Sequence, residues 1–269
     1  MGTLRPAFVA QLESAAEAFG VELQWVSDQW VALLRQKSRN AVVVGYTFPL
    51  NNAAAAELAN DKVAAFEMLR SGGLPAVEHT LVRFAKASAA ADASVFSQFV
   101  APILRAPLVI KPLDGRGGKG VRRAVSDHDI RRELAVIASS CRAAAVSPWV
   151  DIDAEVRLVL LDGVVLLAFC KKRTENADEP EWRHNLRFGA FPAIVEPANV
   201  PVTLSNCARS AAAMLGLRFA AVDLVSSEGL WKIMEINSGV CLERFSATSR
   251  RHYVLAEEVY ACALSAMFP

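Results

Sequence analysis

The stretch LVIKPLDGRGGKGV, residues 108–121, joins an apolar run to a turn that contains four glycines. Gly115, Gly117 and Gly120 have the Gly-x-Gly-x-x-Gly spacing of dinucleotide-binding turns. That motif requires a helix directly after the last glycine, because the helix N-terminus holds the pyrophosphate. Here Gly120 is followed by strand-like VRRAV, and the Gly-x4-Gly-Lys-Ser/Thr pattern of a P-loop is not present. The stretch therefore predicts a β-hairpin.

A glycine-rich hairpin tip has two interpretations. Glycines let the backbone approach an anion closely and turn its N–H groups inward. Arg116 and Lys119 add positive charge, and Lys111 stands at the end of the preceding strand. The alternative is a flexible surface hairpin with solvated lysines. The stretch alone does not decide between the two.

A second group of polar residues lies more than 100 positions further along. Asp223 ends one apolar run, and Glu235 and Asn237 end the next. Residues two apart on a strand face the same way, so Glu235 and Asn237 share a side, and a hairpin would bring Asp223 beside them. Carboxylate and amide oxygens suit Mg²⁺, which proteins often bind together with substrate phosphates. The alternative is that these are ordinary polar residues at strand ends.

Composition restricts the class of protein. The chain has 269 residues, 53% hydrophobic and 21% charged, and a formal net charge of +1. This balance predicts a folded protein and does not favour general attraction to nucleic acid or an anionic membrane. Five widely spaced cysteines fit reduced thiols. No apolar run reaches the roughly 18 residues of a membrane span. We therefore expect a soluble, cytoplasmic protein.

Periodicity and turn signals predict mixed helices and antiparallel hairpins rather than a regular βαβ series. Asp162-Gly163 joins two apolar runs and is a strong hairpin signal. The expected helices are 5–19, 53–73 with a break near Asn60, one that begins at Ser126 or Asp127, 203–216 and 249–266. The expected strands are 21–27, 41–48, 79–84, 108–112, 121–125, the two halves of 155–173, 218–225 and 230–237.

Five ordered motifs make the chain resemble ATP-grasp proteins, most closely the branch of ribosomal-protein glutamate ligases and glutathione synthetase-like enzymes. The motifs cover about residues 40–246: ANDKVAAFEMLRSGGLPAVEHT, LVIKPLDGRGGKGV, SPWVDIDAEVRLVLLDGVVLLAFCKKR, HNLRFGA and VDLV…WKIMEINSG. The resemblance implies an α+β ATP-grasp fold in which two lobes grip ATP. It divides the chain into a short N-terminal α/β segment (1–57), a lobe with the glycine-rich hairpin (58–146) and a C-terminal lobe with the metal site (147–269).

The resemblance also implies an ATP site between the lobes. Lys62 and Lys111 would contact the phosphates, and the glycine loop would fold over them. The backbone of residues 148–150 would hold the adenine edge, and Asp153 would meet the ribose. The residues implied in nucleotide binding are Lys62, Lys111, Gly115, Gly117, Gly118, Pro148, Trp149, Val150 and Asp153. Lys62 has the alternative of a solvated helix lysine, and Trp149 that of a core aromatic residue.

The remaining implied roles concern metal and substrate. Asp223, Glu235 and Asn237 would carry two Mg²⁺ ions, with Mn²⁺ as a further candidate. Lys172, Asn185 and Arg187 would face the transferred phosphoryl group. Arg157 and Arg244 would bind substrate. Arg157 could equally pair with Glu155, and both Lys172 and Arg244 could equally face solvent.

The implied function is an ATP- and Mg²⁺-dependent carboxylate–amine ligase that forms an amide through an acyl phosphate. Its substrates would be small carboxylates and amines, either amino acids or peptides, and no nucleic acid or membrane partner is expected. A homodimer is plausible on family grounds alone. Two alternatives stay open: a kinase of the same architecture that phosphorylates a small molecule, and a nucleotide-binding module without catalysis.

Overall fold

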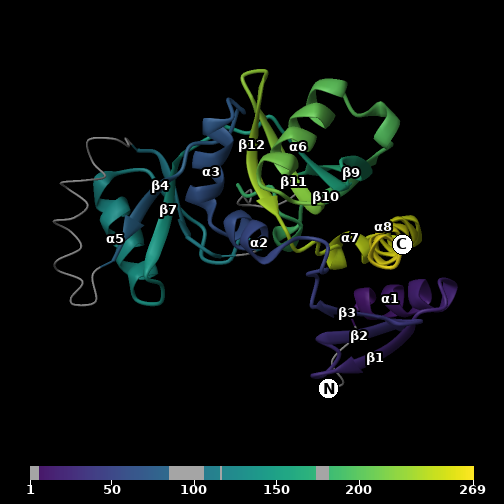
Figure 1. Ribbon diagram of the computed structural model, residues 1–269. Helices are drawn as coiled ribbons and strands as arrows, with labels where there is room; N and C mark the ends of the chain where they lie inside the picture. The colour runs from purple at the N-terminus through teal and green to yellow at the C-terminus, as the bar shows by residue number, and fades with distance from the viewer. Residues whose placement is uncertain (1–5, 85–105, 116, 174–181) are drawn as a thin grey trace.

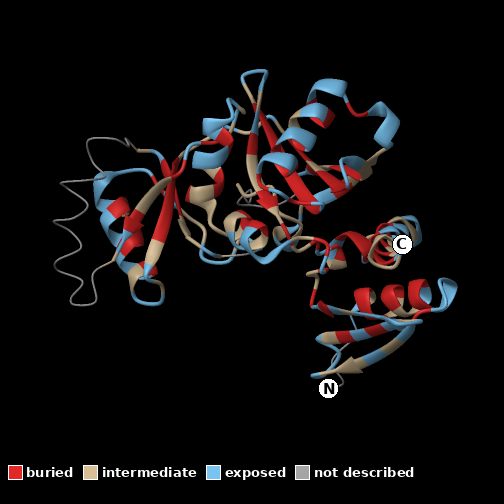
Figure 2. Cartoon of the chain, in the orientation of Figure 1, coloured by how far each residue is buried: buried red, intermediate tan, exposed pale blue. Residues whose placement is uncertain are grey.

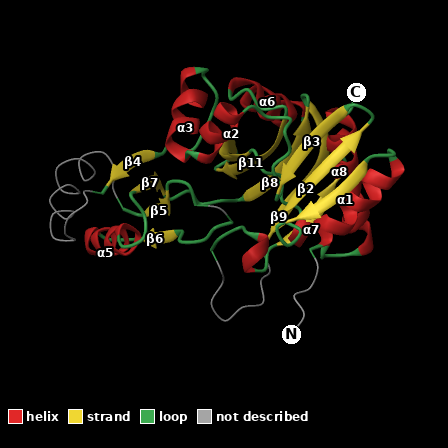
Figure 3. Ribbon diagram, turned by 60° about the horizontal axis from the view of Figure 1, so that its bottom comes forward, coloured by secondary structure: helices red, strands yellow, loops and turns green. Residues whose placement is uncertain are grey.

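The structure is a computed structural model that describes residues 6–84, 106–115, 117–173 and 182–269. Arg116, one of the predicted anion-binding charges, lies outside the described residues. The described residues form three antiparallel sheets, which helices cover (Figures 1 and 3). Among the described residues, no helix has the length and apolar character that crossing a membrane requires.

The N-terminal sheet lies beside helix α1, which packs on the C-terminal helix α8 (Figure 1). Pro6 offers no side-chain cap to α1, and the Glu243 carboxylate instead accepts hydrogen bonds from Ala7 N and Phe8 N, at 3.0 and 2.9 Å. A carboxylate at this end also complements the helix dipole. The elements are α1 (Ala7–Ala18), β1 (Glu22–Val26), β2 (Val31–Gln36), β3 (Arg39–Val44) and α8 (Arg250–Met267).

Two helices follow where the sequence predicts one helix with a break near Asn60. Helix α2 (Ala53–Asn60) begins at Asn52, whose side chain accepts from Ala55 N. Helix α3 (Lys62–Ser71) begins at Asp61, whose carboxylate accepts hydrogen bonds from Val63 N and Ala64 N. Because Asp61 adopts an extended conformation to cap α3, it ends α2. Lys62 therefore stands in the first turn of a helix.

The glycine-rich stretch belongs to a four-stranded sheet in the order β4-β7-β5-β6. Helix α5 covers one face with Ile130, Leu134 and Ile137. The Ser126 side chain caps this helix, as the sequence predicts. Its elements are β4 (Thr80–Arg83), β5 (Leu108–Pro112), β6 (Arg122–Ala124), α5 (Asp127–Ala138) and β7 (Ala143–Pro148). The predicted hairpin is therefore confirmed, with β5 and β6 as its strands.

The acidic residues belong to a five-stranded sheet in the order β10-β9-β8-β11-β12. One face packs on α2, α3 and α6, and the other packs near α1, α7 and α8. Figure 2 shows the buried central strands of this sheet. The elements are β8 (Ala154–Leu161), β9 (Val164–Lys172), η2 (Leu186–Phe188), β10 (Phe191–Val195), η3 (Pro197–Asn199), α6 (Val202–Met214), β11 (Phe219–Ser227), β12 (Leu230–Asn237) and α7 (Glu243–Ser246).

Three strands are absent from the sequence prediction: β2, β7 and β10. Strand β7 contains AAAV, whose alanines favour helix, but it pairs with β4 on one side and β5 on the other. Strand β10 contains Pro192, and its place at the sheet edge tolerates a proline. Helix α3, assigned by sequence to the glycine-hairpin lobe, packs its Ala65 and Leu69 with the five-stranded sheet. The three predicted domain ranges stay a prediction.

Candidate functional site

Asp223 lies at the centre of the candidate site, with only 2% of its surface exposed. On β11 it is opposite Arg157 of β8 on one side and Glu235 of β12 on the other. Arg157 grips the carboxylate with two hydrogen bonds: Nε donates to Oδ1 at 2.7 Å and Nη2 donates to Oδ2 at 2.6 Å. The alternative in which Arg157 pairs with Glu155 is therefore wrong about the partner, and the substrate-binding alternative stays a prediction.

Lys171 completes this buried group of charges. Its Nζ lies 3.0 Å from Asp223 Oδ1 and donates to Glu155 Oε1 at 2.5 Å. Burial raises the pKa of Glu155, although Lys171 opposes that shift. Burial would also raise the pKa of Asp223, but Arg157 and Lys171 outweigh it and hold that pKa at about 2. Asp223 is therefore ionised at neutral pH, and its negative charge is paired with the cations of Arg157 and Lys171.

Glu235 connects the sheet to the glycine hairpin through Lys62. Lys62 Nζ lies 3.7 Å from Glu235 Oε1 and donates to the backbone carbonyls of Gly115 and Leu113, at 2.6 and 3.4 Å. The Lys62 side chain is only 10% exposed, which argues against a freely solvated lysine. A residue from α3 thus contacts both regions that the sequence singles out.

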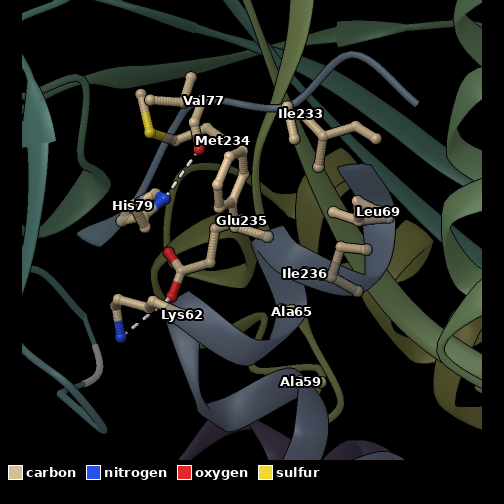
Figure 4. Close-up of a pocket in the computed structure, with 12 residues that line it drawn as sticks. Ala59, Lys62, Ala65, Leu69, Val77, His79, Ile233, Met234, Glu235 and Ile236 are labelled. Carbon is tan, nitrogen blue, oxygen red and sulfur yellow. Dashed lines mark hydrogen bonds and ion pairs between the residues drawn. The ribbon is translucent and has the colours of Figure 1, made fainter. Parts of the chain in front are cut away.

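Lys111 extends from β5 toward the same place. Its Nζ donates to His79 Nε2 at 3.2 Å and lies 3.7 Å from Met234 Sδ. Burial lowers the pKa of the Lys111 ammonium to about 8, Glu235 opposes the shift and Lys62 adds to it. Figure 4 shows His79, Met234, Glu235 and Lys62 around one small pocket between α3 and β12.

The hairpin tip packs against the segment predicted to face the phosphoryl group. A Cβ placed on Gly118 would lie 3.1 Å from Asn185 Nδ2 and 3.1 Å from the Phe188 ring, so only glycine fits without displacing them. Asn185 caps the short helix η2 by accepting from Arg187 N at 2.8 Å, and the Arg187 side chain is exposed. The structure therefore brings Asn185 to the glycine loop.

Lys172 is not on the face that the sequence interpretation requires. Successive residues of a strand point to opposite faces, and on β9 it is Lys171 that contacts Asp223. Lys172 is exposed and shares the opposite face with Cys170, which packs with the α6 side of the sheet. The structure therefore places Lys171, and not Lys172, beside Asp223, and the phosphoryl-facing role of Lys172 stays a prediction.

The segment predicted to hold adenine is built around Trp149. Its backbone N–H donates to Pro107 O at 2.9 Å, so an adenine contact through this group would first have to break that bond. Its ring is covered by the Arg123 guanidinium at 3.8 Å and lies 5.2 Å from the Trp182 ring. Pro148 ends β7 opposite Leu108, Val150 follows, and Asp153 is exposed with its N–H bonded to Ser226 O.

Arg244 stands apart from these charges, on the short helix α7. It is exposed and contributes to an open groove of about 260 Å³ beside η2 and β10. The groove is otherwise uncharged, and its lining is Leu186, Gly189, Ala190, Phe191, Pro192, Arg244, Ala247 and Thr248. Arg244 could therefore meet an anionic group of a ligand in this groove, next to the segment that carries Asn185.

The predicted metal ligands fit a divalent cation only in part. Glu235 has a partly exposed carboxylate, and Asn237 on the same face has a buried Nδ2 without a hydrogen-bond partner. An unpaired buried amide N–H group is unusual. As a donor it fits an acceptor atom of a ligand, whereas only Asn237 Oδ1 could bind a cation. Both Asp223 oxygens are bonded to Arg157. Among the residues that the structure describes, no cluster of three His, Cys, Asp or Glu could hold a metal by itself.

Two residues of the site were missed from the sequence. Lys171 could not have been found from the turn alone, because the β8–β9 register shifts by one residue between Val159 and Leu160. This bulge turns Lys171 rather than Lys172 toward Asp223. Nothing in the sequence near His79 marks it as part of the site, because its place there depends on the contact with Lys111, 32 positions away.

Comparison with known proteins agrees with the motifs. The RimK-like ATP-grasp domain matches residues 59–256. The chain belongs to this RimK-like ATP-grasp family. The match includes the helix of Lys62, the glycine hairpin, and strands β8, β11 and β12. The resemblance inferred from the motifs and the α+β ATP-grasp fold are both confirmed.

Several proteins similar in sequence to this RimK-like chain are named as glutamate ligases. It is 27% identical over 216 residues to a probable alpha-L-glutamate ligase of Psychromonas ingrahamii, covering 77% of this chain and 64% of the relative. A tetrahydromethanopterin:alpha-L-glutamate ligase of Methanocaldococcus jannaschii is 27% identical over 48% of this chain and 44% of its own. The chain thus spans less than two thirds of the length of these relatives.

Solved structures share the RimK-like chain's fold. The D-alanine–D-alanine ligase of Bacillus anthracis complexed with ATP aligns with a TM-score of 0.60 and 16% identity, over 81% of this chain and 70% of that one. A D-cycloserine synthetase aligns with a TM-score of 0.58 and 21% identity, over 78% and 70%. At such identities the likeness establishes the fold alone.

Proposed function

We propose that this protein is an ATP- and Mg²⁺-dependent carboxylate–amine ligase that joins an amino acid, with glutamate as the first candidate, to a small-molecule or peptide acceptor. The observation that carries the proposal is the position of Lys62, which binds the glycine hairpin at Gly115 O and lies 3.7 Å from Glu235. A triphosphate held between these two regions would meet cationic and N–H donors on one side and metal-binding oxygens on the other.

The reaction begins with attack of a substrate carboxylate oxygen on the γ-phosphorus of ATP. The bond from this phosphorus to the β–γ bridging oxygen breaks, and ADP leaves with an acyl phosphate formed. The amine nitrogen then attacks the acyl carbon, inorganic phosphate departs, and the nitrogen loses a proton to give the amide. Lys62, Lys111 and the N–H groups of the glycine loop neutralise and orient the phosphates, so the protein contributes position and charge rather than a covalent intermediate.

Glu235 and Asn237 would hold the divalent cation, which supplies charge neutralisation between the phosphate oxygens when bound. Asp223 would become a ligand only by exchanging Arg157, whose guanidinium now takes both of its oxygens. Mn²⁺ suits the same oxygen donors. An Arg157 released in this way would lie beside the phosphates and could pair with a substrate carboxylate.

Three outcomes of one assay separate the candidate functions. The purified chain is incubated with ATP, Mg²⁺ and pooled amino acids and dipeptides, glutamate pools first, while ADP release is recorded and condensed products are identified by mass spectrometry. Amino-acid-dependent ADP release with a product mass of the two substrates minus water supports the ligase. Hydroxylamine should trap the acyl phosphate as a hydroxamate.

A product that carries a phosphate and resists hydroxylamine would instead identify a kinase. Nucleotide binding without ADP release in any pool would favour a binding module without catalysis. Either result would overturn the ligase proposal.

A further inference from the structure

His79 has no role in the proposed chemistry, yet it is buried beside the candidate site. Only 5% of its surface is exposed. It comes just before β4, in a segment tied to β12: Val77 N donates to Ile233 O at 2.9 Å, and Ile233 N donates to Pro75 O at 2.8 Å. Ala76 and Ile233 form a parallel bridge there. The imidazole is therefore fixed relative to the strand that carries Met234 and Glu235.

The contacts of the ring determine its tautomer. Nδ1 lies 2.9 Å from the carbonyl oxygen of Val77, and a carbonyl can only accept, so Nδ1 carries the hydrogen. Nε2 then presents its lone pair to Lys111 Nζ at 3.2 Å, and an ammonium can only donate. Burial lowers the pKa of His79 well below its usual value, and Lys111 adds to this effect, so the ring is neutral.

Lys62 and Lys111 differ in what holds them. Lys62 is bound by hairpin carbonyls and lies near the Glu235 carboxylate, whereas the contacts of Lys111 Nζ to His79 and Met234 are both to uncharged groups. A neutral acceptor fixes the direction of an ammonium without cancelling its charge. These two contacts therefore leave the positive charge of Lys111 available to an anion, although Glu235 also attracts it.

We propose that His79 is a positioning residue: through its Nε2 lone pair it orients the Lys111 ammonium toward the nucleotide phosphates. This inference rests on the proposed function for its ligand, but the contact that it invokes can be observed without any nucleotide. His79 itself touches no substrate in this scheme. Its effect on binding must therefore pass through Lys111.

The first test observes the contact directly. A buried, hydrogen-bonded lysine ammonium exchanges slowly enough to give a ¹H–¹⁵N NMR signal, and the spectrum of Lys111→Met assigns the Lys111 signal by its loss. We expect His79→Leu to abolish the signal, and His79→Gln, whose side-chain oxygen reaches the place of Nε2, to retain it. A wild-type spectrum without the signal, or an unchanged signal in His79→Leu, would overturn the proposal.

The second test measures the dissociation constant of a non-hydrolysable ATP analogue with Mg²⁺. Loss of a hydrogen bond to a charged group predicts about 10- to 100-fold weaker binding in His79→Leu. His79→Gln should recover most of the affinity, and Glu78→Gln, at the exposed neighbouring position, should match wild type. Thermal unfolding of every variant monitors the fold.

A double-mutant cycle separates positioning from general damage. In the Lys111→Met background, His79→Leu should cause no further loss of affinity. An equal loss in both backgrounds would show a merely structural role and overturn the proposal. If the analogue binds to no variant, wild type included, the proposed function fails while the ammonium signal still decides the role of His79.

Discussion

The five-stranded sheet and the glycine hairpin face each other across the candidate site, but they are held in place by different means. In the sheet, Asp223 is fixed by two neighbouring strands and by side-chain bonds from Arg157 and Lys171. The hairpin contributes backbone: the carbonyls of Leu113 and Gly115 accept from Lys62, and Gly118 touches Asn185.

This difference indicates that the sheet is the rigid side of the site and the glycine hairpin is the side that can adapt to a ligand. Strand register and buried ion pairs place the acidic side with little freedom, because moving one strand would expose or unpair buried charges. Glycines keep the other side free of side-chain bulk, so its N–H groups can approach a phosphate. Changes in the sheet should therefore cost stability, and changes in the hairpin should cost binding.

The largest expected effect is that of removing Arg157. Arg157→Met leaves the buried Asp223 carboxylate with Lys171 as its remaining cation, so we expect a loss of about 3–5 kcal/mol in the free energy of unfolding, measured by urea denaturation. Adding Asp223→Asn should recover part of this loss, because the uncompensated charge is removed. A loss below about 1 kcal/mol in the single variant would mean that the sheet does not depend on this pair.

Glu235 belongs to the same sheet, but its carboxylate is partly exposed and its effect should fall on catalysis. We expect Glu235→Gln to lower amino-acid-dependent ADP release by about 10²–10³-fold, while the unfolding midpoint stays near that of wild type. Glu228→Gln, in the exposed β11–β12 turn, is the matched control. Near-normal turnover in Glu235→Gln would remove Glu235 from the metal-binding set.

Two adjacent hairpin glycines have similar backbone conformations but different surroundings. Gly117 and Gly118 both have positive φ angles, of 63° and 71°, but a Cβ on Gly117 meets nothing within 4 Å. Both alanine variants should suffer strain of roughly 1–2 kcal/mol, and Gly118→Ala should lose about 1–2 kcal/mol more because it collides with Asn185 and Phe188. Titration of an ATP analogue would measure both, and equal losses would contradict the contact.

The smallest expected effect is a pH dependence caused by Lys111. Its charged form attracts phosphate and its pKa in the free protein is about 8, so affinity should fall as pH rises from 7 to 9, by roughly five- to tenfold. Lys111→Arg, which stays protonated, should bind with little pH dependence over this range. The stability has the opposite sign: the folded state loses this proton before the unfolded chain does, so its contribution to stability rises above about pH 8.

Much of the fold could be predicted because its local signals agree with the tertiary structure. Asp162-Gly163 gives the β8–β9 hairpin, Ser126 caps α5, and the break near Asn60 separates α2 from α3. Where local preference and pairing disagree, prediction failed: the alanines of β7 favour helix, but strands on both sides make it a central strand.

The residues of the candidate site also divide into those that the sequence predicted and those that it could not. The sequence indicated Lys62, Lys111, Asp223 and Glu235, and the structure brings them together, although their chemical roles stay predictions. Lys172 was chosen in place of Lys171 because nothing local tells which of two adjacent lysines faces inward. That Arg157 pairs with Asp223 rather than Glu155 depends on how β8 and β11 align.

By itself the sequence determined the order of the elements, the glycine hairpin and the family, because these follow from residue types and spacings along the chain. The tertiary structure alone decided which charges meet. Asp223 with Arg157 and Lys171, Lys62 with Gly115, and Lys111 with His79 are separated by 32 to 66 positions. Their contacts arise from strand register and from packing between elements, and those depend on the burial of many residues at once.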